Sequence, residues 1–370
     1  MKKLLLVFLL IMMVPSMVWG VSLPETYSDK VLIYDLTEDK VLLEKKSDER
    51  SNIASLTKIM TTITAIEKNS NLKEKITITE EMLAGIPWDA SIAGLKKEEV
   101  YTLEDLLYAS ILPSGADATQ AIAVHTSGSV KAFVQDMNDL AKKIGVEVTG
   151  YDVENHYSNI QDVLKILKHA LENNTFKKIF CTKQKTLENG KVVNSTLITY
   201  NRLMGLDTSR ILGSKTGFTA KAGVCIAALI KSNDHDLLLI TLGAPYVYGN
   251  FYNLRDALAL TDFMDKNFDN LKVVKQGDVV LTLPVELSKV DSYEIRATKD
   301  VFKYLPVDYE KDKFEAVYEG KENLSFKDIK GNTLGEVSYY YDGEFLAKEK
   351  VSLETDIDAD VLKVAKYYGV

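Results

Sequence analysis

The sequence predicts an α+β fold in which helices pack on an antiparallel sheet, followed by a small all-β domain. Strand patterns stand at both ends of a helical stretch within residues 21–268, which indicates layers of helix and sheet. The pattern beyond Lys272 is strand-like only. With 370 residues, of which 46% are hydrophobic, the chain also exceeds what a single core usually serves.

Charge and composition exclude several classes of protein. The chain has 45 Lys and Arg residues against 53 Asp and Glu residues, for a formal net charge of −8. A basic nucleic-acid binder and a disordered tail protein are both inconsistent with this balance and with the hydrophobic content. We therefore expect no nucleic-acid partner.

The first twenty residues have the pattern of a signal peptide. Lys2 and Lys3 precede an apolar run from Leu4 to Val14, and a small-residue exit ends at Gly20. The run is too short to cross a bilayer comfortably, and no cysteine follows it to accept a lipid. We expect residues 1–20 to be removed on export, which leaves an acidic mature chain.

The elements of the first domain follow from hydrophobic periodicity. Alternation from Lys30, a polar turn at Glu38-Asp39-Lys40 and renewed alternation to Leu43 predict a β-hairpin. After Ser55, apolar residues recur at helical spacing to about Lys68. The remaining expected elements are helices at 103–112, 118–124, 133–144 and 162–171, strands at 211–212, 223–230 and 237–242, and a helix at 256–268.

The second domain is expected over residues 273–353. Asp342-Gly343 lies between two strand patterns, as in a tight hairpin turn. Residues 356–370 then carry apolar positions near helical spacing, with more acids than lysines. This short acidic helix is a poor candidate for binding an anionic membrane, so we expect membrane contact to be weak or absent.

Ser55 and Lys58 are the first candidates for chemistry. They stand three residues apart at the start of the predicted helix, so both side chains lie on one helix face. The alternative is that Ser55 is an ordinary helix N-cap. A cap favours Glu or Gln at the third helical position, whereas a lysine there opposes the helix dipole. Activation of the Ser55 hydroxyl by the amine explains Lys58 better.

Two further segments have less specific patterns. Lys215-Thr216-Gly217 precedes an apolar run, which places it at the entrance to a sheet strand or on it, where glycine allows close approach of a substrate. A turn that contains a lysine explains this tripeptide equally well. Pro113-Ser114-Gly115 leads into a helix, with Ser114 or Asp117 as an ordinary N-cap.

The order and separation of these segments favour chemistry. A serine with a lysine one turn later, a loop serine about sixty residues on and a Lys-Thr-Gly strand about a hundred residues beyond it form the set found in penicillin-binding proteins and class A β-lactamases. Over about residues 22–268, and more loosely beyond, the sequence resembles the serine D-Ala-D-Ala carboxypeptidases, the low-molecular-mass penicillin-binding proteins. The segments that carry this resemblance are Ala54–Thr61, Glu104–Leu107, Phe133–Asn138 and Lys215–Gly223.

The resemblance implies a β-lactamase/transpeptidase-like first domain that acts on peptidoglycan stem peptides ending in D-Ala-D-Ala. Ser55 would attack the carbonyl between the two D-alanines, Lys58 would be the general base, and Ser114 would relay the proton to the leaving D-alanine. Burial and the nearby cation of Lys215 would keep the Lys58 amine partly deprotonated. β-Lactams would inhibit the protein by acylating Ser55. No metal or organic cofactor is implied.

The resemblance also implies how the substrate is held and where the protein works. The Lys215-Thr216-Gly217 strand would bind the substrate, with its lysine and threonine on the terminal carboxylate, a role that Arg255 could share. The backbone N–H groups of Ser55 and Phe218 would form the oxyanion hole. The exported protein would act in the cell envelope, either extracellular or periplasmic.

Two departures from the family pattern affect the site. Where the family usually has Ser-x-Asn, this chain has Ser114-Gly115-Ala116, so an amide that grips the substrate backbone is missing. Loss of one such hydrogen bond costs about 1–3 kcal/mol. The loop after the Met-Asn helix is also shortened and runs straight on at Val148–Ser158, so we expect the wall of the site to differ.

Other functions fit the sequence less well. A class A β-lactamase needs a glutamate-bearing loop before Lys215, and none is evident. The four histidines show neither the pattern nor the pairing of a zinc peptidase, and a Ser-His-Asp hydrolase would need a G-x-S-x-G turn. The main alternative is a catalytically weakened relic of the same fold that binds β-lactams or cell wall, motivated by Ala116. Retention of Ser55, Lys58, Ser114 and Lys215 together argues against it.

Overall fold

The structure, a computed structural model, describes residues 21–146 and 158–369. The expected signal peptide at 1–20 and nearly all of the expected shortened loop at 148–158 lie outside the described residues. The chain divides into two compact units, with the boundary between Asp265 and Lys266. Each unit is described by itself below.

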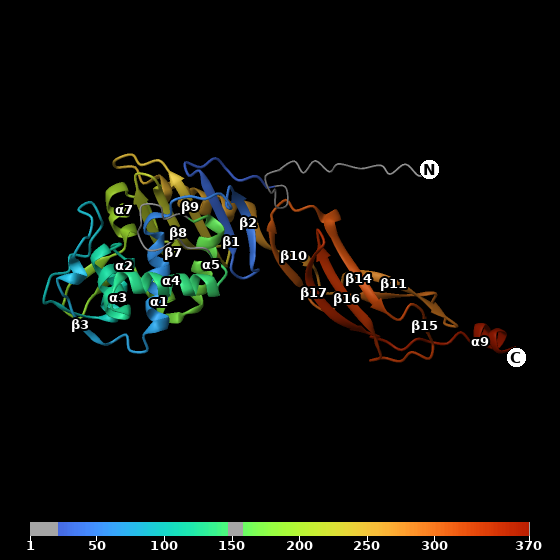
Figure 1. The fold of residues 1–370 in the computed structure, drawn as a ribbon. Coiled ribbons are helices and arrows are strands. Elements are labelled where there is room, and N and C mark those ends of the chain that lie inside the picture. Colours follow the sequence, from blue (N-terminus) through green and yellow to red (C-terminus); the bar gives the residue numbers. More distant parts are fainter. Residues whose placement is uncertain (1–20, 147–157, 370) are drawn as a thin grey trace, which may run out of the picture. The chain divides into compact units, whose positions relative to one another are not determined.

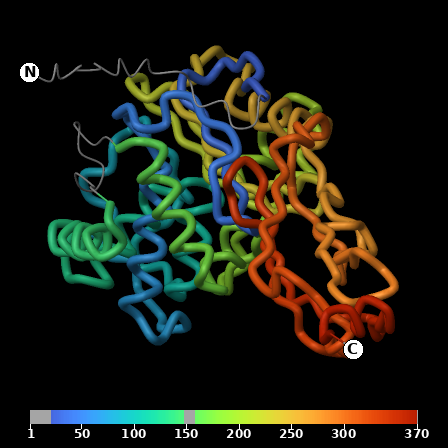
Figure 2. Tube along the Cα trace, turned by 90° about the vertical axis from the view of Figure 1, so that its right-hand side faces the viewer, coloured from blue at the N-terminus to red at the C-terminus, as the bar shows by residue number. Residues whose placement is uncertain are grey.

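A five-stranded antiparallel sheet organises the first unit (Figure 1). Its strand order is β2-β1-β9-β8-β7, so β7 is an edge strand. In Figure 2 the blue hairpin of β1 and β2 lies beside yellow strands from much later in the chain. The strands are β1 (Lys30–Asp35), β2 (Lys40–Lys45), β7 (Ile211–Thr219), β8 (Gly223–Ser232) and β9 (His235–Ala244).

The predicted hairpin and the two predicted strands at 223–230 and 237–242 are confirmed, whereas β7 is much longer than the expected 211–212. The tripeptide Lys215-Thr216-Gly217 lies on this strand, which was one of its two expected places, although Ser214, Lys215 and Thr216 are polar. All three are nevertheless buried, at 5%, 1% and 4% exposure. A buried polar stretch on an edge strand is the local feature that positions the site.

Most helices of the first unit lie on one side of this sheet and bury the larger core with it (Figure 1). Alternate strand residues such as Leu32, Cys225 and Leu238 belong to this core, as the period of two along a strand requires. The helices of the first unit are α1 (Thr57–Lys68), α2 (Leu103–Ile111), α3 (Ala116–Ser127), α4 (Val130–Lys143), α5 (Ile160–Glu172), α6 (Asn174–Phe180), α7 (Thr196–Met204) and α8 (Tyr252–Asn267).

Helices α1 to α5 and α8 were expected, and α6 and α7 were not. Helix α6 is only two turns long, which is too short for a clear period. Helix α7 is rich in threonine and other residues of low helix propensity. The minor elements are η1 (Ala54–Leu56), η2 (Glu81–Leu83), β3 (Lys75–Thr77), β4 (Val100–Thr102), β5 (Gln184–Thr186) and β6 (Val192–Asn194).

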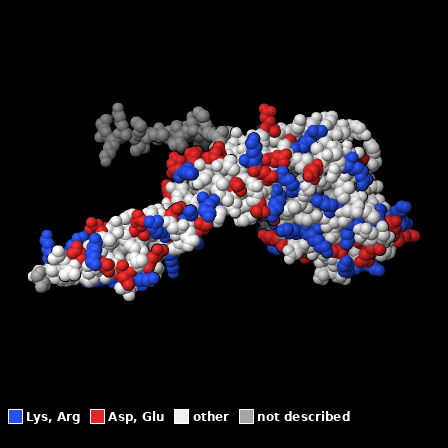
Figure 3. Space-filling model, turned by 180° about the vertical axis from the view of Figure 1, so that it is seen from behind, with Lys and Arg blue, Asp and Glu red and all other residues white. Residues whose placement is uncertain are grey.

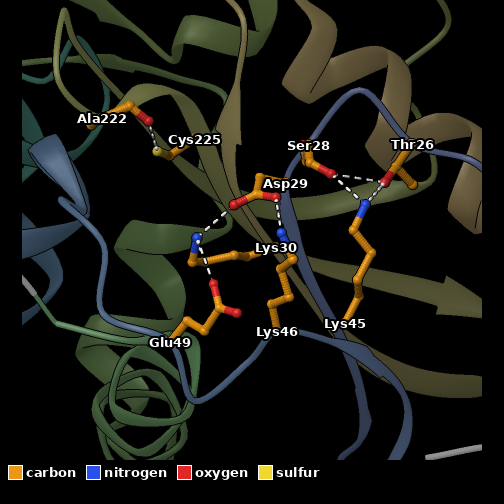
Figure 4. Close-up of polar contacts among 9 residues, drawn as sticks. All are labelled: Thr26, Ser28, Asp29, Lys30, Lys45, Lys46, Glu49, Ala222 and Cys225. Atoms are coloured by element: carbon orange, nitrogen blue, oxygen red, sulfur yellow. Dashed lines mark hydrogen bonds and ion pairs between the residues drawn. The ribbon is translucent and has the colours of Figure 1, made fainter. Parts of the chain in front are cut away.

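The segment before β1 is fixed by charged side chains, as Figure 4 shows. Asp29 accepts hydrogen bonds from Lys30 Nζ at 2.6 Å and from Lys46 Nζ at 2.8 Å. Lys45 Nζ donates to the carbonyl of Ser28 at 2.8 Å. Lys45 is the last residue of β2 and Lys46 follows it. These contacts therefore hold the segment before β1 against the hairpin.

Helix α8 holds the same segment from another direction. Asp256 accepts hydrogen bonds from the backbone N–H and the hydroxyl of Ser28, at 2.7 and 2.6 Å. Asn253 Nδ2 donates to the carbonyl of Cys225 in β8 at 2.9 Å, so the start of the helix also contacts the sheet. Helix α8 therefore connects the N-terminal segment to strand β8 of the sheet.

The second unit is all-β apart from short helical segments. Its strands pair in the orders β10-β13, β12-β11-β15 and β14-β16-β17, and they bury a small core around Ile295, Val337 and Tyr339. The elements are β10 (Phe268–Val274), β11 (Val279–Glu286), β12 (Ser292–Arg296), β13 (Val301–Pro306), η3 (Lys311–Lys313), β14 (Phe314–Gly320), β15 (Leu324–Ser325), β16 (Thr333–Tyr341), β17 (Glu344–Ser352) and α9 (Val361–Tyr368).

Details of the second unit differ from the expected 273–353 and 356–370. Strand β10 begins at Phe268, five residues earlier than expected. The sequence did not indicate this start, because the polar residues Asp269 and Asn270 interrupt the strand pattern. The Asp342-Gly343 turn joins β16 to β17 as predicted, with φ values of 50° and 76°. Helix α9 begins only after Asp360, whose side chain caps it, so the helix itself contains two lysines and no acid.

Charges of both signs are interspersed over each unit on the face shown in Figure 3. The charged residues on this face do not form a single basic stripe. Within the described part of the chain, no helix combines the length and apolar character that spanning a bilayer requires.

Candidate active site

Ser55 lies in η1, the short turn that leads directly into α1. Its Oγ accepts a hydrogen bond from Lys58 Nζ, 2.9 Å away and one turn later. The N-cap residue of α1 is Leu56, and no side chain caps that end of the helix. Ser55 is therefore not the N-cap, and the S-x-x-K spacing instead brings a hydroxyl and an amine into contact.

Ser114 and Lys215 join two segments that are far apart in the sequence. Lys215 Nζ donates to Ser114 Oγ at 2.9 Å and to the carbonyl of Thr216 at 2.6 Å. The N-cap of α3 is Gly115, so neither Ser114 nor Asp117 has that role. Ser114 has a φ of 64°, in the left-handed region that non-glycine residues rarely adopt. Strained backbone of this kind is typical of functional sites.

The two lysines belong to one electrostatic environment. Burial, and then the positive charge of Lys58, hold the pKa of Lys215 well below its usual range. A buried amine beside a second amine disfavours a proton on both at once. The sequence led us to expect the lowered pKa at Lys58. The structure shows a lowered pKa at Lys215, whose side chain is almost completely buried, and the expectation for Lys58 stays a prediction.

Gly217 lies where β7 passes the nucleophile. A Cβ at this position would be 3.0 Å from both Ala54 Cβ and the backbone N of Ser55. We expected glycine to admit a substrate, and the structure shows that it admits the main chain of η1. Ala54, which faces Gly217 across this contact, has a φ of 46°. The close approach of β7 and η1 therefore sets the position of Ser55 against the edge strand.

Thr216 is anchored by residues that the sequence did not single out. Its Oγ1 donates to Thr196 Oγ1 at 2.9 Å, and the Tyr200 side chain also hydrogen bonds to Thr216. The Tyr200 ring stacks on Phe251 with 3.8 Å between ring centroids. Burial raises the pKa of the Tyr200 hydroxyl. No sequence signal indicated these contacts, because α7 itself had not been recognised.

Ala116, which replaces the usual asparagine, begins α3 beside a fixed loop. It is 8% exposed, and its N–H donates to the carbonyl of Ser91 at 2.7 Å. The next residue, Asp117, accepts hydrogen bonds from the three N–H groups of residues 93–95 at 2.7–2.9 Å. Asp117 thus fixes residues 93–95 at the start of α3, a role that sequence reasoning missed.

Phe218 and Arg255 are the predicted residues with the most exposed side chains. Phe218 follows Gly217 on β7 with its ring 47% exposed and packed on Tyr246. Arg255 lies on α8 with an exposed side chain that makes no hydrogen bond or ion pair to the described residues. Its part in carboxylate binding remains a prediction. Among the described residues, no three His, Cys, Asp or Glu side chains gather in the way a metal site needs.

Two family models match the chain. Residues 17–246 match the D-alanyl-D-alanine carboxypeptidase model, and residues 268–359 match the C-terminal domain of penicillin-binding protein 5. The first match covers more than half of the chain. The second begins at the same residue as strand β10.

Individual relatives agree with these matches. The D-alanyl-D-alanine carboxypeptidase DacA of Haemophilus influenzae is 27% identical over 92% of this chain and 88% of its own. DacF of Bacillus subtilis is 28% identical over 86% and 82%. The crystal structure of penicillin binding protein 5 from Haemophilus influenzae has a TM-score of 0.62 at 27% identity, and covers 92% of this chain and 100% of that chain. The chain therefore belongs to the D-alanyl-D-alanine carboxypeptidase family, as its sequence predicted, with a helix-and-sheet domain followed by the all-β C-terminal domain of penicillin-binding protein 5.

Proposed function

We propose that this protein is a serine carboxypeptidase that removes the terminal D-alanine from peptidoglycan stem pentapeptides, and that penicillins inhibit it by acylating Ser55. The contact between Ser55 Oγ and Lys58 Nζ, at 2.9 Å, carries the proposal. A serine hydroxyl is a weak nucleophile until a base takes its proton, and an amine held one helical turn away is suited to that task. The family membership of the chain supports the same activity.

The reaction has two chemical steps. The Ser55 oxygen bonds to the carbonyl carbon of the penultimate D-alanine as Lys58 accepts the hydroxyl proton. The bond from that carbon to the terminal D-alanine nitrogen then breaks, and the proton reaches the leaving amine through Ser114. Water hydrolyses the resulting ester and releases the shortened peptide. The lowered pKa of Lys215 agrees with this scheme, because two neighbouring buried amines disfavour a proton on each of them.

Substrate binding would use the free edge of β7. An edge strand presents unpaired N–H and C=O groups that can pair with an extended peptide. Lys215 and Thr216 would hold the terminal carboxylate together with Arg255, and the N–H groups of Ser55 and Phe218 would stabilise the oxyanion. The 3.0 Å separation between a Cβ at Gly217 and the backbone N of Ser55 supports this placement of the two N–H donors.

One experiment separates this function from its alternative. The mature protein is treated with penicillin and analysed by mass spectrometry, and D-alanine release is measured from a pentapeptide ending in D-Ala-D-Ala. We expect an adduct on Ser55 and D-alanine release, both abolished in Ser55→Ala. An adduct without D-alanine release would indicate a relic that only binds β-lactams, the alternative suggested by Ala116 in place of the usual asparagine. Full activity in Ser55→Ala would show that the nucleophile is wrongly assigned.

We also propose that the protein is exported and that its membrane contact is weak or absent. Helix α9 exposes Val361, Leu362, Tyr367 and Tyr368, but it is only two turns long and follows three aspartates. A short helix is a single weak membrane signal, and acids beside it oppose anionic lipid. The test is flotation of the full mature chain with vesicles of anionic lipid. Binding of most of the protein would contradict this expectation, and an intact N-terminus on the purified secreted protein would contradict signal-peptide removal.

A further inference from the structure

Two exposed aromatic rings lie at the end of the sheet where strand β7 continues past Gly217. Phe218 is 47% exposed and Tyr246 is 53% exposed, and their ring centroids are 4.4 Å apart. Phe218 belongs to β7, and Tyr246 follows the end of β9. The sheet brings them together, because Phe218 pairs with Val224 of β8 and Val224 pairs with Ala244 of β9.

These rings differ from the other aromatic pair at the site. Tyr200 and Phe251 are half-buried, and they form part of the packing around Thr216. Phe218 and Tyr246 keep about half of their surface in water, although large apolar surfaces are normally buried. Tyr248, on the same turn after β9, is 90% exposed. An uncovered aromatic surface at the end of the strand proposed to bind the substrate is suited to contact with a ligand.

The direction of the substrate along β7 follows from the proposed carboxylate site. If Lys215 and Thr216 hold the terminal carboxylate, the leaving D-alanine lies at that end, and the rest of the peptide runs toward Phe218 and Thr219. Extended residues rise about 3.4 Å each. The residue before the two D-alanines therefore lies about two strand residues beyond the terminal one, within reach of the exposed rings.

We propose that Phe218 and Tyr246 form a subsite for the side chain of the residue immediately before the two terminal D-alanines, and that this subsite selects a long alkyl chain. This inference rests on the proposed function and on its substrate orientation. Methylene groups stack on ring faces while the far end of a long side chain stays in water. Lys221, exposed on the turn after β7, adds a like charge near a cationic side chain. The rings are therefore expected to bind the methylene groups of the substrate side chain and not to recognise a positive charge at its end.

The test uses peptides acyl-X-D-Ala-D-Ala in which X is alanine, norleucine, lysine or Nε-acetyl-lysine. For the unmodified enzyme we expect kcat/KM roughly tenfold higher with the three long side chains than with alanine, a discrimination typical of a few methylene groups. Tyr246→Ala should remove most of this preference while leaving the alanine peptide nearly unchanged. Tyr246→Phe, which keeps the ring, should retain the preference.

Tyr27→Ala is the matched control. Tyr27 is 56% exposed and stacks on Tyr252 with 4.1 Å between ring centroids, so its removal deletes an exposed ring that is stacked on a second ring in the same unit. It should leave the preference intact. Equal rates for all X, a preference for lysine alone, or an equal loss on every peptide in Tyr246→Ala would each overturn the inference. The last result would mean that Tyr246 only supports the Phe218 backbone. No release from any peptide by the unmodified enzyme would instead overturn the proposed function, and the inference with it.

Discussion

Lys215 Nζ lies 2.9 Å from Ser114 Oγ, although the two residues are 101 positions apart in the sequence. This hydrogen bond connects the edge strand of the sheet with the loop before α3. Both side chains are buried, at 1% and 5% exposure. The same amine feels the charge of Lys58, whose partner is Ser55. Two serine and lysine pairs therefore share one site, which leads to the first prediction.

Ser114→Ala is expected to lower kcat for D-alanine release by roughly 100-fold or more, the usual effect of losing a group that transfers protons. The reason is that the leaving amine loses its route to a proton, while Lys215 loses one acceptor. The measurement is steady-state release of D-alanine, together with the rate of penicillin acylation.

Ser110→Ala provides the control for the loss of a buried hydroxyl. Ser110 is fully buried, and its Oγ is 2.9 Å from Thr119 Oγ1. Its substitution should reduce the free energy of unfolding by about 1–3 kcal/mol with little effect on kcat. If Ser114→Ala behaved like Ser110→Ala, with lower stability and unchanged kcat, Ser114 would be a structural residue only.

Gly217→Ala is expected to reduce acylation by penicillin more than it reduces stability. The new Cβ would be 3.0 Å from Ala54 Cβ and from the backbone N of Ser55, so β7 and η1 must separate. Displacement of a nucleophile by even about 1 Å costs roughly 100-fold in rate. The measurement is the second-order rate of acylation.

A second substitution tests this explanation. Ala54→Gly removes the Cβ that the new methyl group would meet, and it also relieves the φ of 46° at position 54. The double variant should therefore recover part of the acylation rate. An equally slow double variant would show that the loss arises elsewhere than at the contact with Ala54.

The local parts of this site could be predicted from the sequence, and the long-range parts could not. The contact between Ser55 and Lys58 follows from helical geometry over three residues, and the Asp342-Gly343 turn from local backbone preference. The hydrogen bond from Thr216 to Thr196 required a helix that periodicity did not show. The need for glycine at 217 arises from η1, more than 160 positions earlier in the chain. Close approach between distant segments leaves no local pattern.

Ala116→Asn is expected to increase penicillin acylation and D-alanine release by about fivefold to tenfold, the worth of one hydrogen bond of about 1 kcal/mol. The added amide would face the substrate backbone at the start of α3. Ala116→Ser, which is too short to supply that amide, is the matched control and should give little gain. An unchanged rate in Ala116→Asn would mean that the missing asparagine does not limit this enzyme.

Asp29→Asn is expected to lower the free energy of unfolding near pH 7, and the difference from the unmodified protein should disappear in acid. Hydrogen bonds from Lys30 and Lys46 lower the pKa of Asp29 from 3.8 to about 2. A carboxyl group with a lowered pKa in the folded protein stabilises it above the unfolded pKa, and this contribution is lost as the pH falls through the folded pKa. The side chain is 44% exposed, so we expect solvent screening to limit the effect to about 1 kcal/mol.

Urea unfolding of both proteins between pH 7 and pH 2 measures this difference in the free energy of unfolding. The control is Asp48→Asn, at an exposed position shortly after the same hairpin. The difference should be constant above about pH 4 and should shrink between pH 4 and pH 2. A difference that persisted undiminished at pH 2 would show that Asp29 acts through packing and not through its charge.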